Sequence, residues 1–181
     1  HEGPYISWPA KSDWFFNKEM AGGGALLDMG VHALDILRFM IGEIKDISAN
    51  VKTLVRDIEV EDNAVCAVTF ENGAMGYLEV GWSSKAGRLG IEIYGDDGSM
   101  VIDYETPIRV FIDKKKDIGG PGWVDLTEYK GGGWDTEMKA FVEALIEGKP
   151  VPVDGHDGLV GVKLATAAYK SNAEGVRVEV K

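Results

Sequence analysis

Between residues 45 and 129, seven strand-like runs alternate with polar turns, and this alternation constrains the fold more than any other feature of the chain. Two of the turns, Glu71-Asn72-Gly73 and Asp96-Asp97-Gly98, have the length and composition of β-hairpin turns, in which glycine supplies a positive φ. Strands joined by turns this short run antiparallel. The runs are Lys45–Val55, Ala64–Phe70, Ala74–Ser83, Leu89–Tyr94, Met100–Tyr104, Ile108–Asp113 and Trp123–Tyr129.

Helical patterns lie on both sides of this sheet in the sequence, and each is followed by a glycine that favours a helix end. In chain order we expect an irregular arm (1–24), a helix (25–41) before Gly42, the sheet (44–130), and a closing part (134–181) with helices at Asp135–Glu147 and Leu159–Ala173 and an edge strand at Val176–Val180. This order predicts a single α+β domain, 1–181, in which a large, mostly antiparallel open sheet carries helices on one face.

The composition narrows the possible partners. The net charge is −11 and no basic cluster occurs, so we expect neither a nucleic acid nor an anionic membrane surface as partner. No run approaches the ~20 apolar residues of a membrane span. The single cysteine, Cys66, fits a small buried side chain and a cytoplasmic protein. Because the chain opens with His-Glu-Gly-Pro-Tyr, we expect no signal peptide and a fragment or an engineered start.

The first helix carries the candidate site. It is apolar on nearly every side and is therefore expected to be buried, yet Asp28, His32 and Asp35 interrupt it at spacings of four and three. At about 100° per residue these side chains point within roughly 60° of one another. The preceding Gly22-Gly23-Gly24 would let another backbone or a ligand come close. The pattern indicates the wall of a pocket.

Three interpretations of this stripe remain open. His32 and a nearby carboxylate can move a proton, as the oxidation of a secondary alcohol requires while hydride leaves for a cofactor. Alternatively, His32 is a core histidine satisfied by Asp28 or a carbonyl group. As a third possibility, Asp28 and His32 hold a metal ion, although the sequence offers no clear third ligand.

At these residues the sequence resembles the glucose–fructose oxidoreductase / inositol dehydrogenase / rhizopine catabolism (Gfo/Idh/MocA) family. Trp14 and the segment from Gly22 to Asp35 are similar to the GGGxLxDxGxHxxD stretch of the family's C-terminal domain. A second, less specific match lies in the closing helices. It comprises Glu137–Leu145, Gly148-Lys149-Pro150, Asp154–Gly158 and Ser171–Val178.

The resemblance implies a C-terminal domain related in fold to those of dihydrodipicolinate reductase and glyceraldehyde-3-phosphate dehydrogenase. It implies that Asp28 and His32 act on a sugar or polyol hydroxyl, and that the open sheet face forms the subunit interface of a homo-oligomer. Apolar residues on both faces of several strands independently favour a homodimer. The expected substrate-binding residues are Trp14, Gly24, Asp35 and His156, although Asp154 and Asp157 beside His156 also fit simple helix capping.

The chain departs from the full family in lacking any G-x-G-x-x-G motif or strand–helix alternation for a Rossmann domain. NAD or NADP is therefore expected in the full-length enzyme, on a missing N-terminal Rossmann domain, and none on this chain. We expect the chain alone to be inactive. A binding or dimerisation module that kept the fold without catalysis is the alternative, and a metal-binding domain using Asp28 and His32 is a weaker one.

Overall fold

The computed structural model describes residues 13–85, 90–103, 108–114, 118–128 and 132–180, and these form two compact units. Unit 1 is built from residues 1–87 and 153–181, and unit 2 from residues 88–152. The first twelve residues of the expected arm lie outside the described part. Its remainder contains a 3-10 turn, Asp13–Phe16, and the short helix α1, Lys18–Ala21, where we had expected irregular structure.

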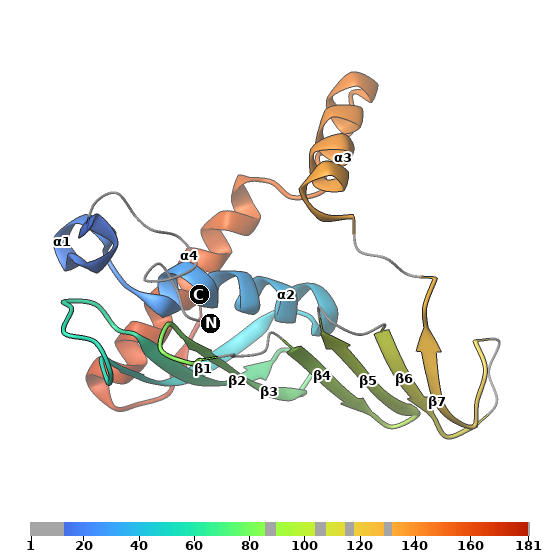
Figure 1. Cartoon of the computed structure of the whole chain (residues 1–181), viewed down its shortest axis with the longest axis horizontal. Coiled ribbons are helices and arrows are strands. Elements are labelled where there is room, and N and C mark those ends of the chain that lie inside the picture. The colour runs from blue at the N-terminus through green and yellow to red at the C-terminus, as the bar shows by residue number, and fades with distance from the viewer. Residues whose placement is uncertain (1–12, 86–89, 104–107, 115–117, 129–131, 181) are drawn as a thin grey trace. The chain divides into compact units, whose positions relative to one another are not determined.

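Unit 1 contains a four-stranded antiparallel sheet in the order β3-β2-β1-β8, covered on one face by helices α2 and α4 (Figure 1). Alternate residues of the central strand β2 are buried against these helices, as expected for a strand with one covered face. The elements are a π-helical turn (Leu26–Gly30), α2 (Val31–Ile41), β1 (Ile44–Lys52), β2 (Asn63–Phe70), β3 (Met75–Gly81), α4 (Gly155–Glu174) and β8 (Val178–Glu179).

The main core lies between this sheet and its helices. Leu34 of α2 and Leu164 of α4 meet Ile47, Cys66 and other side chains of the sheet's inner face. Burial raises the pKa of the Cys66 thiol to about 12, so this cysteine is an unreactive core residue, as expected.

The site helix is less buried than its composition predicts. Leu34 is the one fully buried side chain of α2, while Ile36 and Phe39 point to solvent, Phe39 with 91% of its surface exposed. The prediction of a buried helix was wrong because α2 packs against the sheet and α4 through one side only. Apolar side chains on its other side mark a surface that another chain segment can cover.

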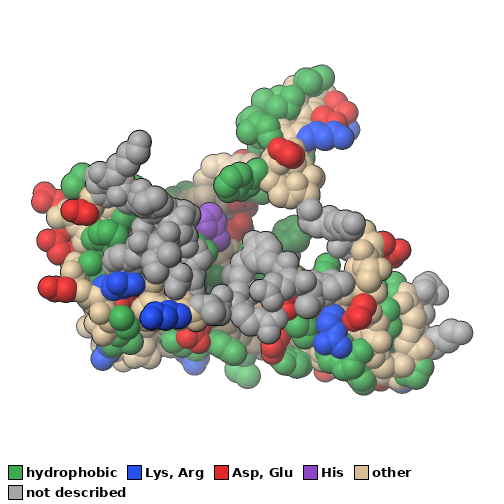
Figure 2. All heavy atoms as spheres, in the orientation of Figure 1, with side chains coloured by type: hydrophobic (Ala, Val, Ile, Leu, Met, Phe, Trp, Pro, Cys, Tyr) green, Lys and Arg blue, Asp and Glu red, His purple; other side chains and the backbone are tan. Residues whose placement is uncertain are grey.

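Unit 2 contains a second four-stranded antiparallel sheet, in the order β4-β5-β6-β7, and helix α3. The α+β class with mostly antiparallel strands is confirmed, but pairing divides the described strands between two sheets rather than one. Figure 2 shows that α3 exposes apolar side chains along its length, and only its Ala144 is buried. The elements are β4 (Gly90–Gly95), β5 (Gly98–Asp103), β6 (Ile108–Ile112), β7 (Gly122–Leu126) and α3 (Gly133–Glu147).

The two predicted hairpin turns are both present, but each requires its glycine for a different reason. Gly73 has a φ of +89°, as a hairpin turn of this kind requires. Gly98 is not among the glycines with positive φ, so that part of the prediction was wrong. A side chain there would place its Cβ 2.0 Å from the carbonyl oxygen of Phe111, and glycine is needed because β6 passes so close.

Candidate active site

The glycines before the site helix allow its first turn to lie against the loop that precedes β2. The Ala25 and Leu26 backbone N–H groups donate to Glu61, at 3.0 Å to its carbonyl oxygen and 2.9 Å to its Oε1 atom. A Cβ at Gly24 would lie 2.0 Å from the same carbonyl oxygen. The expected close approach is therefore made by another backbone, and contact between Gly24 and a substrate stays a prediction.

Glu61 is itself a buried carboxylate, and the hydroxyl of Tyr169 on α4 donates to its Oε1 atom at 2.7 Å. Burial, together with this carboxylate, raises the pKa of Tyr169 well above its usual range. The tyrosine is therefore a permanent donor that fixes Glu61, and through Glu61 the start of the site helix. Neither residue is predictable from the sequence, because an isolated acidic loop residue and a helical tyrosine carry no distinctive pattern.

Asp28 lies in the π-helical turn and is half-buried. Its Oδ2 atom accepts a hydrogen bond of 3.0 Å from the indole Nε1–H of Trp82, the residue that follows β3. Burial raises the pKa of Asp28, while the Trp82 hydrogen bond and the charge of His32 act in the opposite direction. The site thus contains a carboxylate whose basicity is increased by its surroundings.

His32 lies in the first turn of α2 and is exposed, four residues after Asp28 and within electrostatic reach of it. Asp35, the third member of the predicted stripe, instead pairs with Arg38 at 3.2 Å. The structure therefore brings Asp28 and His32 together and gives Asp35 a different partner. A half-buried carboxylate beside an accessible imidazole is suited to accepting a proton and passing it to solvent.

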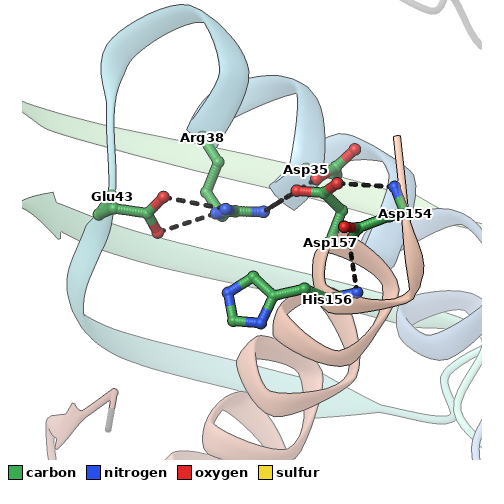
Figure 3. Close-up of polar contacts among 6 residues, drawn as sticks. All are labelled: Asp35, Arg38, Glu43, Asp154, His156 and Asp157. Carbon is green, nitrogen blue, oxygen red and sulfur yellow. Dashed lines mark hydrogen bonds and ion pairs between the residues drawn. The ribbon is translucent and has the colours of Figure 1, made fainter. Parts of the chain in front are cut away.

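Arg38 connects α2 to the residues around it (Figure 3). Its guanidinium donates two hydrogen bonds of 2.9 Å to Glu43, and it lies 3.8 Å from Asp157 at the start of α4. Hydrogen bonding to Arg38 is the main reason that the pKa of Glu43 is lowered. This group holds α2 against α4.

His156 belongs to this second group rather than to the Asp28 pair. Its backbone N–H donates to Asp154 at 2.7 Å, and Asp157 accepts from the Asp154 N–H at 3.0 Å, which completes a capping box (Figure 3). The predicted helix capping is confirmed, and α4 begins at Gly155, earlier than the expected Leu159, because of it. A substrate contact by His156 stays a prediction.

Of the remaining candidates, Trp14 is 41% exposed and stacks on Phe15, with ring centroids 3.8 Å apart. A contact between Trp14 and a substrate also stays a prediction. Trp82 is buried, with 1% of its surface exposed. In the described part of the chain, no three His, Cys, Asp or Glu side chains come together in a way that could hold a metal ion. Within the same residues, no helix combines the length and the apolar character needed to cross a membrane.

A comparison with known protein families agrees with the α+β fold of this chain. Residues 4–101 match the GFO/IDH/MocA C-terminal domain, and the chain belongs to this oxidoreductase family. It is 32% identical, over 88% of its length, to the uncharacterized oxidoreductase YrbE of Bacillus subtilis, of which the match covers 49%. It is 31% identical, over 84% of its length, to myo-inositol 2-dehydrogenase of Thermotoga maritima, of which the match covers 48%.

A solved structure is also similar. Levoglucosan dehydrogenase in complex with NADH and levoglucosan superposes with a TM-score of 0.82 and 26% identity, covering 93% of this chain and 53% of that protein. The chain spans about half the length of the curated relatives that it matches.

Proposed function

We propose that this chain is the substrate-binding and oligomerisation half of an NAD(P)-dependent oxidoreductase that acts on a secondary alcohol of a sugar, a polyol or a related compound. The observation that carries the proposal is the Asp28–His32 pair, a half-buried carboxylate beside an exposed imidazole. The names of the relatives, an inositol dehydrogenase and a levoglucosan dehydrogenase, support this substrate class.

In this proposal Asp28 accepts a hydrogen bond from the reacting hydroxyl and orients it. His32 takes the hydroxyl proton, a role that an imidazole side chain can fill. The nicotinamide cofactor supplies the hydride acceptor. Because the chain contains no G-x-G-x-x-G motif, its own residues do not fit the dinucleotide, and we assign that group to a Rossmann domain outside the chain.

The site helix supports the idea of a second domain next to the site. His32, Ile36 and Phe39 follow one another at helical spacing, and all three are exposed. Burying two large apolar side chains beside the imidazole would exclude water from the site and contribute about 3 kcal/mol to domain packing. We place the Rossmann domain on this side of α2.

We further propose a cytoplasmic homodimer formed through the outer face of the unit 1 sheet. Val65, Met75 and Tyr77 lie on this face, and Tyr77 leaves 72% of its surface exposed. Light scattering on the 181-residue chain should report a dimer, and Tyr77→Glu should favour the monomer because it introduces a charge at the contact. A chain that stays monomeric at high concentration would rule out this interface.

The decisive test of the function uses the chain joined to its nucleotide-binding domain, with NADH formation on a panel of polyols and sugars followed by absorbance. Asp28→Asn and His32→Gln are each expected to lower kcat by at least about 100-fold. Asp57→Asn, a change of an exposed loop aspartate, serves as the matched control and should leave kcat unchanged. Calorimetry should detect no NAD binding by the isolated chain.

If the complete protein oxidises none of these compounds while still binding one of them, the second candidate, a non-catalytic binding module, would replace the first.

A further inference from the structure

We propose that Trp82 is a positioning residue: its indole N–H holds the Oδ2 atom of Asp28, so that the other carboxylate oxygen is presented to the reacting hydroxyl. This inference rests on the proposed function, because it assigns Trp82 a part in that reaction. The observation behind it is the 3.0 Å hydrogen bond between two residues 54 positions apart in the chain.

The indole is fixed from several directions. Trp82 is 1% exposed and belongs to a small core cluster with Ala25 and Val60. The ring of Phe16 meets it edge to face, with centroids 6.4 Å apart. Its backbone N–H donates to the carbonyl oxygen of Asp62 at 2.8 Å. Because the ring cannot turn without disturbing this packing, the N–H keeps one direction.

The carboxylate end is fixed through the neighbouring residue of the same loop. The Asp28 backbone N–H donates to the Gly24 carbonyl oxygen at 2.9 Å, and Glu61 binds the N–H groups of the two residues after Gly24. Donor and acceptor are therefore both anchored to the loop before β2, through Asp62 and Glu61, and their hydrogen bond forms without further ordering. Reactive groups held in this way need little reorganisation during a reaction.

The chemistry of the donor supports a role beyond packing. An indole nitrogen can only donate a hydrogen bond. It therefore stabilises the ionised Asp28 carboxylate, which accepts hydrogen bonds, in preference to the protonated form. Burial of Asp28 acts against ionisation, and the indole counteracts it. The hydrogen bond keeps Asp28 an acceptor for a substrate hydroxyl.

The experiment separates the hydrogen bond from the packing. Trp82 is replaced by Phe and, in a second variant, by 3-benzothienylalanine, which keeps the bicyclic shape and lacks the N–H donor. Trp123→Phe, which removes an indole that belongs to unit 2, is the control. In each 181-residue chain the pKa of Asp28 is measured by NMR of its labelled carboxyl carbon.

Both Trp82 variants are expected to raise the pKa of Asp28, and the Trp123 control is expected to leave it unchanged. In the chain joined to its nucleotide-binding domain, the acid limb of the kcat–pH profile should move to higher pH together with the pKa of Asp28. At the pH optimum, kcat should fall about tenfold, the factor that corresponds to one hydrogen bond to a charged group. An unchanged Asp28 pKa in the benzothienylalanine variant would overturn the proposal, as would a shifted pKa that leaves the kcat profile unmoved.

These results differ from a failure of the proposed function. If Asp28→Asn leaves oxidation of the alcohol unchanged, the function assigned to the site is wrong, whatever the NMR titration of the Trp82 variants shows.

Discussion

Replacing Asp62 by alanine should destabilise unit 1 more than almost any other single change of a polar residue. The Asp62 side chain is fully buried and accepts four hydrogen bonds, all between 2.7 and 2.9 Å. Three come from consecutive backbone N–H groups, those of residues 54 to 56, and one from the Asn63 side chain. One carboxylate thus fixes the loop between β1 and β2.

The magnitude follows from these bonds. A hydrogen bond contributes about 1 kcal/mol net, and somewhat more when the acceptor is charged. The freed N–H groups belong to an exposed loop and regain water, which moderates the loss. Asp62→Ala should therefore lower the free energy of unfolding by about 3 to 4 kcal/mol at pH 7.

The effect depends on pH in a defined direction. Burial opposes the ionisation of Asp62, but the hydrogen bonds together outweigh it and lower the pKa of this carboxyl below the ordinary aspartate value of 3.8. The stability that Asp62 contributes is therefore fully present above that ordinary pKa, and is lost as the pH falls through the lower value of the folded state. The difference between the original chain and Asp62→Ala should shrink in this acidic range.

Urea unfolding followed by tryptophan fluorescence, at pH 7 and at several values below pH 4, measures this difference. Asp57→Ala provides the control, because Asp57 is an exposed aspartate of the same loop. A cost of less than about 1 kcal/mol for Asp62→Ala at pH 7, or an effect independent of pH, would show that these hydrogen bonds do not stabilise the loop as described.

Two further substitutions test other contacts by the same unfolding assay. Gly24→Ala should cost about 2 to 3 kcal/mol of stability, because its Cβ would lie 2.0 Å from the Glu61 carbonyl oxygen. Gly158→Ala is the control and should not destabilise the chain, because a Cβ there meets nothing within 4 Å. Equal losses of stability in the two variants would contradict this prediction. Arg38→Met should cost about 1 kcal/mol at pH 7 through the lost bidentate pair with Glu43. Because the pKa of Glu43 is lowered in the folded protein, the stability lost in Arg38→Met should become smaller as the pH falls through that lowered pKa. Lys139→Met, at an exposed position, is the control and should have little effect on stability at any pH.

Local signals in the sequence predicted most of the secondary structure. Helices α2, α3 and α4 end at Gly42, Gly148 and Gly175, as expected, because glycine is favoured at a helix C-terminus. The strands lie within a few residues of their predicted positions, because their apolar runs and their turns agree with each other. The π-helical turn was not predicted, since it depends on how the start of the helix meets Glu61, which is far away in sequence.

The site was predicted in part. The spacing of Asp28 and His32 identified a pair that the structure keeps together, whereas Asp35 pairs with Arg38. The partners that hold the site, Glu61, Asp62, Trp82 and Tyr169, were not assigned these roles. An acidic pair before a strand looks the same in a sequence whether it faces water or accepts buried hydrogen bonds, and only tertiary contacts distinguish the two cases.

The way in which Asp62 fastens its loop has a consequence for how such a protein can diversify. The carboxylate binds main-chain N–H groups, which every residue except proline possesses, so the loop keeps its course whatever side chains occupy positions 54 to 56. Those positions therefore tolerate extensive exchange without loss of shape. The side chains at these three positions can therefore be exchanged, in evolution or by design, while Asp62 alone keeps the backbone of the loop in place.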